Sequence, residues 1–276
     1  MVSSTHTYYT ADGVPMESSV TTRISHDVVP GNFYGPRMSA AVFSLCERMR
    51  LAPTAPWNAD QREQLRRWGQ YKSAAEIAAA WDANRDNGTY VHQTIEYLLR
   101  GVCRLEEKRV EAHEIDQFLA FYKWFSRRYE IIAVEAIILA PDISTGGSID
   151  AIAHERASTN PDEIVLVDWK NMPPCDWEKN APLCNYFSMP RCKRAKQEVQ
   201  LNMYASMIEA QTPKRVVRML LVFFDLVAGC WDLIEVTRRR EETEAYLAQL
   251  RRATAHVRPT EPLLVPAEEV KPLRRR

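Results

Sequence analysis

Two aspartates and a lysine stand at the ends of apolar runs in this chain. Asp150 follows Gly146-Gly147-Ser148-Ile149, and Asp168 follows Ile164-Val165-Leu166-Val167, two positions before Lys170. The two-residue alternation of a strand places Asp168 and Lys170 on the same face. Two carboxylates can share a divalent cation, and the lysine can orient or activate a water. The layout favours metal-dependent hydrolysis of a phosphodiester, with Asp150, Asp168 and Lys170 as catalytic residues.

The aspartates alone are equally typical of solvated strand ends. Lys170 favours the catalytic interpretation, because a lysine two places after an acid at the end of a buried strand has no packing rationale. Its ammonium could hold the attacking water and offset charge in the transition state. Magnesium needs few carboxylates besides waters and substrate phosphate, so we expect Mg²⁺ or Mn²⁺ as the cofactor.

A histidine and a glutamate precede these strands at helical spacing. We expect His92 to open a helix after a break at Asn87-Gly88-Thr89, with Glu96 on the same helix face. An imidazole there could complete a cation shell. A lone helical histidine is more often structural, so only the neighbouring motifs favour His92 as a ligand.

Three more residues are candidates. Gln200 and Tyr204 are four apart on an expected helix, and both polar ends could reach a phosphate at the strand ends. Glu135 interrupts the apolar run 131–139, where a carboxylate is costly unless it is paired or exposed. We expect Glu135 either to face the site or to pair with a basic residue.

Composition limits the other classes of protein. The chain has 276 residues, is 46% hydrophobic and carries 36 basic and 36 acidic residues, so any DNA contact must come from local patches. With no secretory leader and no apolar stretch of about 20 residues, we expect a soluble, intracellular protein without a membrane partner. The six scattered cysteines are expected to be reduced thiols; Cys175, Cys184 and Cys192 match no common metal-binding spacing.

Hydrophobic periodicity predicts helices and then a sheet. Residues 131–140, 148–153 and 164–169 are expected to form a meander, followed by a helix at 196–211, strands at 216–224 and 230–236 and a helix at 238–256. The predicted fold class is α/β, a mixed central sheet flanked by helices with a helical N-terminal addition. The expected regions are a hairpin and loop (1–40), a helical region (41–128), a core (129–256) and a disordered tail (257–276).

The ordered motifs resemble the RecB-like exonuclease branch of the PD-(D/E)XK nuclease superfamily. They are Gly88-Thr89-x-x-His92-x-x-x-Glu96, Gly147-x-x-Asp150, Asp168-x-Lys170 and Gln200-x-x-x-Tyr204. At lower specificity, Tyr9 to Gly13 and Ser19-Val20-Thr21 are similar to exonuclease-like proteins of large DNA viruses.

The resemblance implies a restriction-endonuclease-like core in which the helix carrying His92 takes part. It implies metal ligation by His92, Asp150, Asp168 and the Trp169 carbonyl, catalysis by Lys170, and help at the substrate from Gln200 and Tyr204. Substrate contacts are expected from Ser19, Thr21, Glu96, Glu135, Lys193 and Arg194.

The implied function is a Mg²⁺- or Mn²⁺-dependent exonuclease acting on DNA ends, with a role in DNA repair, recombination or replication. A structure-specific endonuclease on the same core and a non-catalytic nucleic-acid-binding protein are the alternatives. The sequence contains no helicase motif, so a helicase or recombinase partner would be a separate chain. Aromatic and basic residues at 57–81 could contact a single strand or could simply pack the helical region.

Overall fold

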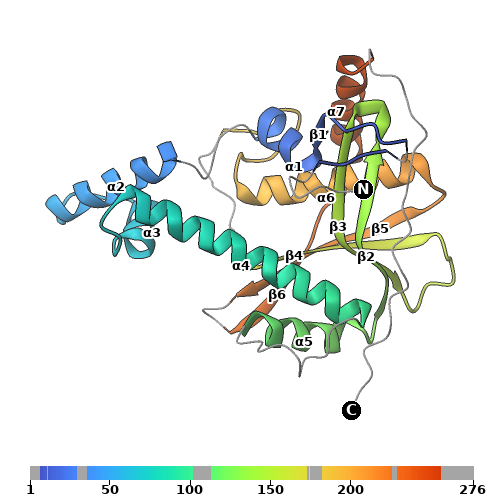
Figure 1. The fold of residues 1–276 in the computed structure, drawn as a ribbon, viewed down its shortest axis with the longest axis horizontal. Coiled ribbons are helices and arrows are strands. Elements are labelled where there is room, and N and C mark those ends of the chain that lie inside the picture. The colour runs from blue at the N-terminus through green and yellow to red at the C-terminus, as the bar shows by residue number, and fades with distance from the viewer. Residues whose placement is uncertain are drawn as a thin grey trace. The chain divides into compact units, whose positions relative to one another are not determined.

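The computed structural model describes residues 7–10, 12–29, 36–101, 113–172, 174, 182–225 and 229–255 (Figure 1). The chain divides into two compact units. The larger comprises Met1–Pro30 and Val91–Arg276, and the smaller is Gly31–Tyr90.

A mixed sheet of six strands forms the centre of the larger unit. The strands are β1 (Ser18–Ser19), β2 (Tyr129–Ala140), β3 (Thr145–Glu155), β4 (Glu163–Lys170), β5 (Arg215–Asp225) and β6 (Cys230–Glu235). The antiparallel meander β2–β3–β4 confirms the prediction for this part of the chain. β5 then pairs parallel to β4, and β6 antiparallel to β5. The predicted α/β class with a mixed sheet flanked by helices is confirmed.

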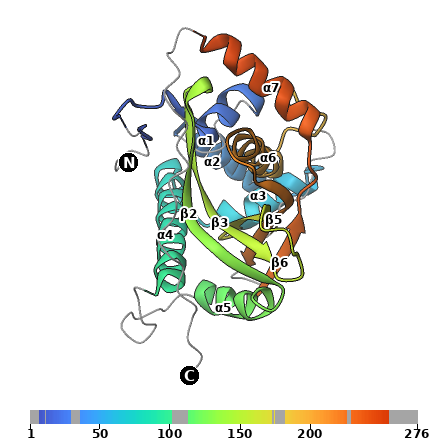
Figure 2. The same cartoon turned by 90° about the vertical axis from the view of Figure 1, so that its right-hand side faces the viewer.

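Helices lie on both sides of this sheet (Figure 2). They are α1 (Val20–Arg23), the end of α4 (Ala74–Arg100), α5 (His113–Phe125), α6 (Lys193–Gln211) and α7 (Arg240–Ala253), with a π-helix at Ile24–Val28 and a 3₁₀ helix at Pro141–Ile143. The apolar residues of α4 and α5 form one buried cluster with alternate residues of β3, β4 and β5. In Figure 2, α6 lies on the opposite side of the sheet from α4.

The parallel β4–β5 pair needs a long connection, and α6 provides it. The helix contacts β5, β2 and β4 and also packs against α7. Twelve of its residues are buried, so it is held by tertiary packing on several sides. Such a helix is a rigid support for side chains directed at the strand ends.

The smaller unit is helical. It contains α2 (Pro36–Leu51), α3 (Ala59–Trp68) and the beginning of α4. Trp68 contacts Tyr71 and Trp81, with ring centroids 5.9 Å and 5.6 Å apart. Trp68 therefore packs against both of these aromatic neighbours, and a contact of this region with a single strand stays a prediction.

The predicted break before His92 is wrong, because α4 runs without interruption from Ala74 to Arg100. Glycine in a helix costs only about 1 kcal/mol relative to alanine. The burial of Val91, Ile95 and Leu98 in the core of the larger unit offsets that cost. The Thr89 hydroxyl makes a hydrogen bond within the helix by donating to the Arg85 carbonyl at 3.2 Å. His92 therefore lies inside a long helix and does not open one.

Several predictions fall partly or wholly outside the described residues. These are the tail 257–276, part of the stretch between the strand at 164–169 and the helix at 196–211, and two of the six cysteines, Cys103 and Cys175. The described cysteines, Cys46, Cys184, Cys192 and Cys230, are free thiols. Among the helices that the structure describes, none has the length and apolar character needed to cross a membrane. The N-terminal hairpin is present as an antiparallel bridge between Tyr9 and Pro15.

Candidate functional site

Asp150 and Asp168 lie at neighbouring positions on β3 and β4. The strands are antiparallel and Ala151 pairs with Val167; Asp150 precedes Ala151 and Asp168 follows Val167, so the two aspartates lie side by side. Both are buried, with 6% and 2% of their surface exposed. The Trp169 backbone N–H donates to Oδ2 of Asp150 at 2.7 Å. The backbone of β4 therefore fixes the orientation of the Asp150 carboxylate.

Lys170 contacts Asp168 directly. Its Nζ lies 2.6 Å from Oδ2 of Asp168. Burial raises the pKa of Asp168 to about 6, although the charge of Lys170 works in the other direction. Burial also opposes charge on Lys170, but the Asp168 and Asp150 carboxylates outweigh it and raise the pKa of Lys170. The ammonium of Lys170 is therefore charged at neutral pH and faces two carboxylates.

His92 reaches the same place from α4. Its Nδ1 lies 3.3 Å from Oδ1 of Asp150. Burial opposes a charged imidazole, but the Asp150 carboxylate raises the pKa of His92. Burial likewise opposes charge on Asp150, and the imidazole beside it lowers the pKa of that carboxyl. Each group thus stabilises the charged form of the other.

Glu135 joins this cluster from β2. One ligand atom from each of His92, Glu135 and Asp150 lies within 4.8 Å of the other two. Glu135 faces Asp150 across the sheet, between the pairs Val134–Ala151 and Ala136–Ile149. Its φ of 48° is rare for a residue with a side chain and marks a locally strained backbone. Burial, and next the Asp150 charge, raise the pKa of Glu135 to about 8.

The structure therefore places Glu135 among prospective cation ligands, whereas the sequence suggested a substrate contact. The signal available in the sequence was an acid interrupting an apolar strand. The left-handed backbone at Glu135 and its neighbours His92 and Asp150 come from tertiary structure, which periodicity does not report.

The donors in this cluster suit a hard divalent cation. Octahedral ligands at about 2.1 Å from a cation are separated by about 3 Å when adjacent and about 4 Å when opposite. The 3.3 Å between His92 and Asp150 fits adjacent positions, and the 4.8 Å span of the three donors requires a small contraction. Burial, and next the Asp150 charge, raise the pKa of Glu135, and a bound cation would favour its charged form.

Trp169 links the two strands by its backbone. Its N–H is committed to Asp150, and its buried indole contacts the Phe118 ring, with centroids 6.0 Å apart. The sequence pointed to the Trp169 carbonyl as a metal ligand, and that role stays a prediction. The indole itself is part of the core.

Gln200 and Tyr204 face β3 from α6. Gln200 Nε2 donates to the Tyr204 hydroxyl at 3.4 Å, and the Tyr204 side chain is buried with 2% exposed. A Cβ on Gly147 would lie 2.4 Å from the Tyr204 hydroxyl oxygen. Gly147 is therefore required for Tyr204 to sit against β3, three residues before Asp150. This explains the glycine of the Gly147-x-x-Asp150 motif.

Ser19 and Thr21 lie at the start of α1. The Ser19 hydroxyl accepts from the Thr22 N–H at 3.1 Å and lies 2.9 Å from the Thr21 hydroxyl. Ser19 is thus the N-cap of α1, and a contact of either residue with substrate stays a prediction.

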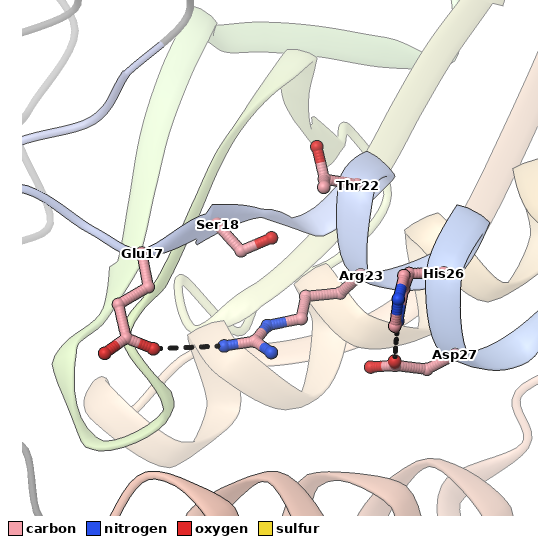
Figure 3. Close-up of a pocket in the computed structure, with 6 residues that line it drawn as sticks. All are labelled: Glu17, Ser18, Thr22, Arg23, His26 and Asp27. Carbon is pink, nitrogen blue, oxygen red and sulfur yellow. Dashed lines mark hydrogen bonds and ion pairs between the residues drawn. The ribbon is translucent and has the colours of Figure 1, made fainter.

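A cavity of about 270 Å³ opens beside this cap (Figure 3). Arg23 pairs with Glu17 at 3.6 Å and His26 with Asp27 at 2.8 Å. Acids and bases of its lining thus offset one another. None of His92, Glu135 and Asp150 lines this cavity.

The remaining predicted substrate contacts have partners within the protein. Glu96 pairs with Arg100 at 2.9 Å, and its charge contributes to raising the pKa of Glu135. Arg194 pairs with the buried Glu198 at 2.8 Å. Lys193 precedes Arg194 in the first turn of α6. Their roles toward a substrate stay predictions.

The chain matches no protein-family model, and no curated protein is similar to it.

Proposed function

We propose that this chain is a divalent-metal-dependent nuclease that hydrolyses phosphodiester bonds of DNA, acting on ends as an exonuclease. The observation that carries the proposal is the convergence of His92, Glu135 and Asp150 within 4.8 Å. Lys170 and Asp168 adjoin Asp150 on the next strand. Five ionisable groups gathered together, two of them buried aspartates, are costly unless function retains them.

The fold supports a restriction-endonuclease-like core. The elements are a β2–β3–β4 meander, the crossover helix α6 and a strand parallel to β4. In this arrangement Asp150 lies in the middle of β3, not at a strand end as the sequence suggested, and Asp168 lies near the end of β4, while α6 supplies Gln200 and Tyr204. This matches the RecB-like motifs in order along the chain.

His92, Glu135, Asp150 and Asp168 would hold Mg²⁺ or Mn²⁺. Such a cation supplies Lewis acidity toward the phosphate oxygens and makes water a better nucleophile. The mixed imidazole and carboxylate donors suit Mn²⁺ as well as Mg²⁺. The four protein donors come from α4, β2, β3 and β4, so binding requires the folded larger unit.

Lys170 positions the attacking water. Hydrolysis joins the water oxygen to phosphorus, breaks one P–O ester bond and transfers a proton to the departing sugar oxygen. The charged ammonium of Lys170 can hold that water and offset the negative charge on the phosphoryl group in the transition state. Asp168, at 2.6 Å, keeps the ammonium in position. Gln200 and Tyr204 orient the phosphate from the side of α6.

The test is degradation of end-labelled linear DNA with Mg²⁺, with Mn²⁺ and with chelator. We expect cleavage only with metal, and a loss of about 10²- to 10³-fold in Lys170→Ala. Lys214→Ala is the matched control, because Lys214 also pairs with an aspartate, Asp162, at 3.0 Å. Equal activity in wild type and Lys170→Ala, or cleavage that survives the chelator, contradicts the proposal.

Two further substrates separate the alternatives. A covalently closed circle has no ends, so its cleavage would favour a structure-specific endonuclease over an exonuclease. A fluorescent single strand reports binding without turnover. Binding that strengthens when divalent metal is removed, with no cleavage under any metal, would favour a non-catalytic DNA-binding protein.

A further inference from the structure

Tyr8 is a buried tyrosine near the prospective cation ligands His92, Glu135 and Asp150, and it has no part in the hydrolysis proposed above. It belongs to the N-terminal hairpin, far from the site in sequence, and 7% of its surface is exposed. The Met16 N–H donates to the Tyr8 carbonyl at 2.7 Å, and Tyr9 bridges to Pro15. The hairpin therefore holds the Tyr8 backbone in place.

The Tyr8 side chain lies on β3 at Gly146. A Cβ on Gly146 would lie 2.7 Å from Cβ and 2.8 Å from Cγ of Tyr8, closer than real contacts allow. Gly146 thus accommodates Tyr8 as Gly147 accommodates Tyr204. Leu139, Met16 and Tyr8 form a small buried cluster at this point.

The phenol hydroxyl reaches Ser148. A phenol that starts at Gly146 and runs along a strand extends about two residues, since two residues rise about 6.6 Å. Burial raises the pKa of both Tyr8 and Glu135, and in each case a hydrogen bond with the Ser148 side chain acts to lower it. Ile137 pairs with Ser148 in the β2–β3 ladder, which places the serine beside the strained segment of β2.

Glu135 needs such support. Its backbone is left-handed within a strand, and a residue in that conformation persists only when its surroundings hold it there. Its carboxylate stands beside Asp150, a like charge that pushes it away. A neutral hydrogen-bonding chain can hold the carboxylate without adding charge.

We propose that Tyr8, acting through Ser148, is a positioning residue that holds the Glu135 carboxylate in place for a divalent cation. This inference rests on the proposed function in one respect only: it assumes that the site binds a divalent cation. Tyr8 does not touch the cation or the substrate in this account.

The experiment measures binding of Mn²⁺ alone to the full chain, by calorimetry or by the electron paramagnetic resonance of free Mn²⁺. Tyr8→Phe keeps the ring on Gly146 and removes only the hydroxyl. We expect Tyr8→Phe to weaken Mn²⁺ binding by about 10-fold, the lower end of the range for outer ligand-supporting groups. Ser148→Ala should do the same. Tyr9→Phe, the same change one residue along the hairpin, should leave the affinity unchanged.

The double variants separate positioning from general damage. If Tyr8 acts on Glu135, then Tyr8→Phe should have no further effect on Mn²⁺ affinity in a Glu135→Gln background. A loss of the same size in both backgrounds, or wild-type affinity in Tyr8→Phe, overturns the inference. A wild-type chain that binds Mn²⁺ but leaves DNA uncut would instead overturn the proposed function and would leave the positioning result standing.

Discussion

Strand β4 has an aspartate–lysine pair at each end, and the two pairs differ in burial. Asp162, just before the strand, pairs with Lys214 at 3.0 Å, with 44% and 36% of their side chains exposed. Asp168, near its end, pairs with Lys170 at 2.6 Å, with 3% and 21% exposed. The residue types and the separations are similar.

The difference shows where function is to be sought. An exposed pair is screened by water and contributes about 0 to 1 kcal/mol. A buried pair must offset the desolvation of both charges, and replacing it by apolar residues is often neutral or stabilising. The Asp168–Lys170 pair is also crowded by Asp150, whose charge helps to raise the pKa of Asp168. An arrangement with that cost is expected to be retained for chemistry.

The largest expected effect is on DNA cleavage and concerns Asp150, which lies on β3 beside the buried pair Asp168–Lys170. Asp150→Asn should lower metal-dependent DNA cleavage by about 10²- to 10³-fold, because it removes a charge that holds the cation and stabilises the transition state. Asp162→Asn, the same change at the exposed end of β4, should leave the cleavage rate unchanged. Rates on end-labelled DNA at saturating Mn²⁺ test both variants, and similar rates for the two would remove the distinction between the two ends.

The next effect concerns the free energy of unfolding. Lys170→Met leaves Asp168 buried without its partner and should cost about 3 kcal/mol at pH 8. The cost should be smaller at pH 5, where Asp168, whose pKa is about 6, takes up a proton. Lys214→Met should cost less than about 1 kcal/mol. Urea denaturation at the two pH values measures these differences, and equal losses from both lysines would contradict the account.

Glu135, which lies beside Asp150, should also make the free energy of unfolding depend on pH. The folded pKa of Glu135 is about 8 against an ordinary value of 4.5, so the folded state binds more protons between these limits. The free energy of unfolding of the metal-free chain should therefore fall as the pH rises from 4.5 to 8. Glu135→Gln should reduce that fall, and Asp162→Asn should not. Thermal unfolding midpoints across this range provide the measurement; identical pH profiles for wild type and Glu135→Gln would contradict the prediction.

The smallest effect concerns the helix that brings His92 to the buried end. A Cβ on Gly88 would meet no atom within 4 Å, and α4 is continuous there. Gly88→Ala should therefore stabilise the chain by about 1 kcal/mol, with cleavage unchanged. Destabilisation in a thermal melt would mean that the helix is interrupted at Gly88, as the sequence pattern suggested.

The strands β2 to β6 and the acid and lysine near the end of β4 could be predicted from the sequence, whereas Asp150, expected at a strand end, lies in the middle of β3. The strands of the β2–β4 meander, β5 and β6 follow from apolar runs of strand length, and α6 follows from hydrophobic periodicity. Asp150, Asp168 and Lys170 were found because each ends or follows such a run. These features can be predicted because each depends on a few neighbouring residues in the sequence.

The features that could not be predicted depend on contacts between segments that are distant in the sequence. Gly88 was expected to break α4, because propensity does not register the packing of Val91 and Ile95 against the sheet. Glu135 was expected at the substrate, because its left-handed backbone is not visible in the sequence. Tyr8 gave no signal, since its importance depends on Gly146, more than a hundred residues later.

The most direct test of the central claim is the position of Mn²⁺ in crystals of the chain, located by its anomalous scattering. We predict a peak bonded at about 2.2 Å to His92 and Asp150, with Glu135 or Asp168 completing the protein ligands. Asp150→Asn crystals grown in the same way should lose the peak. Manganese bound elsewhere, with the His92–Asp150 contact at 3.3 Å intact and no density between these side chains, would contradict the assignment of this cluster as a catalytic metal centre.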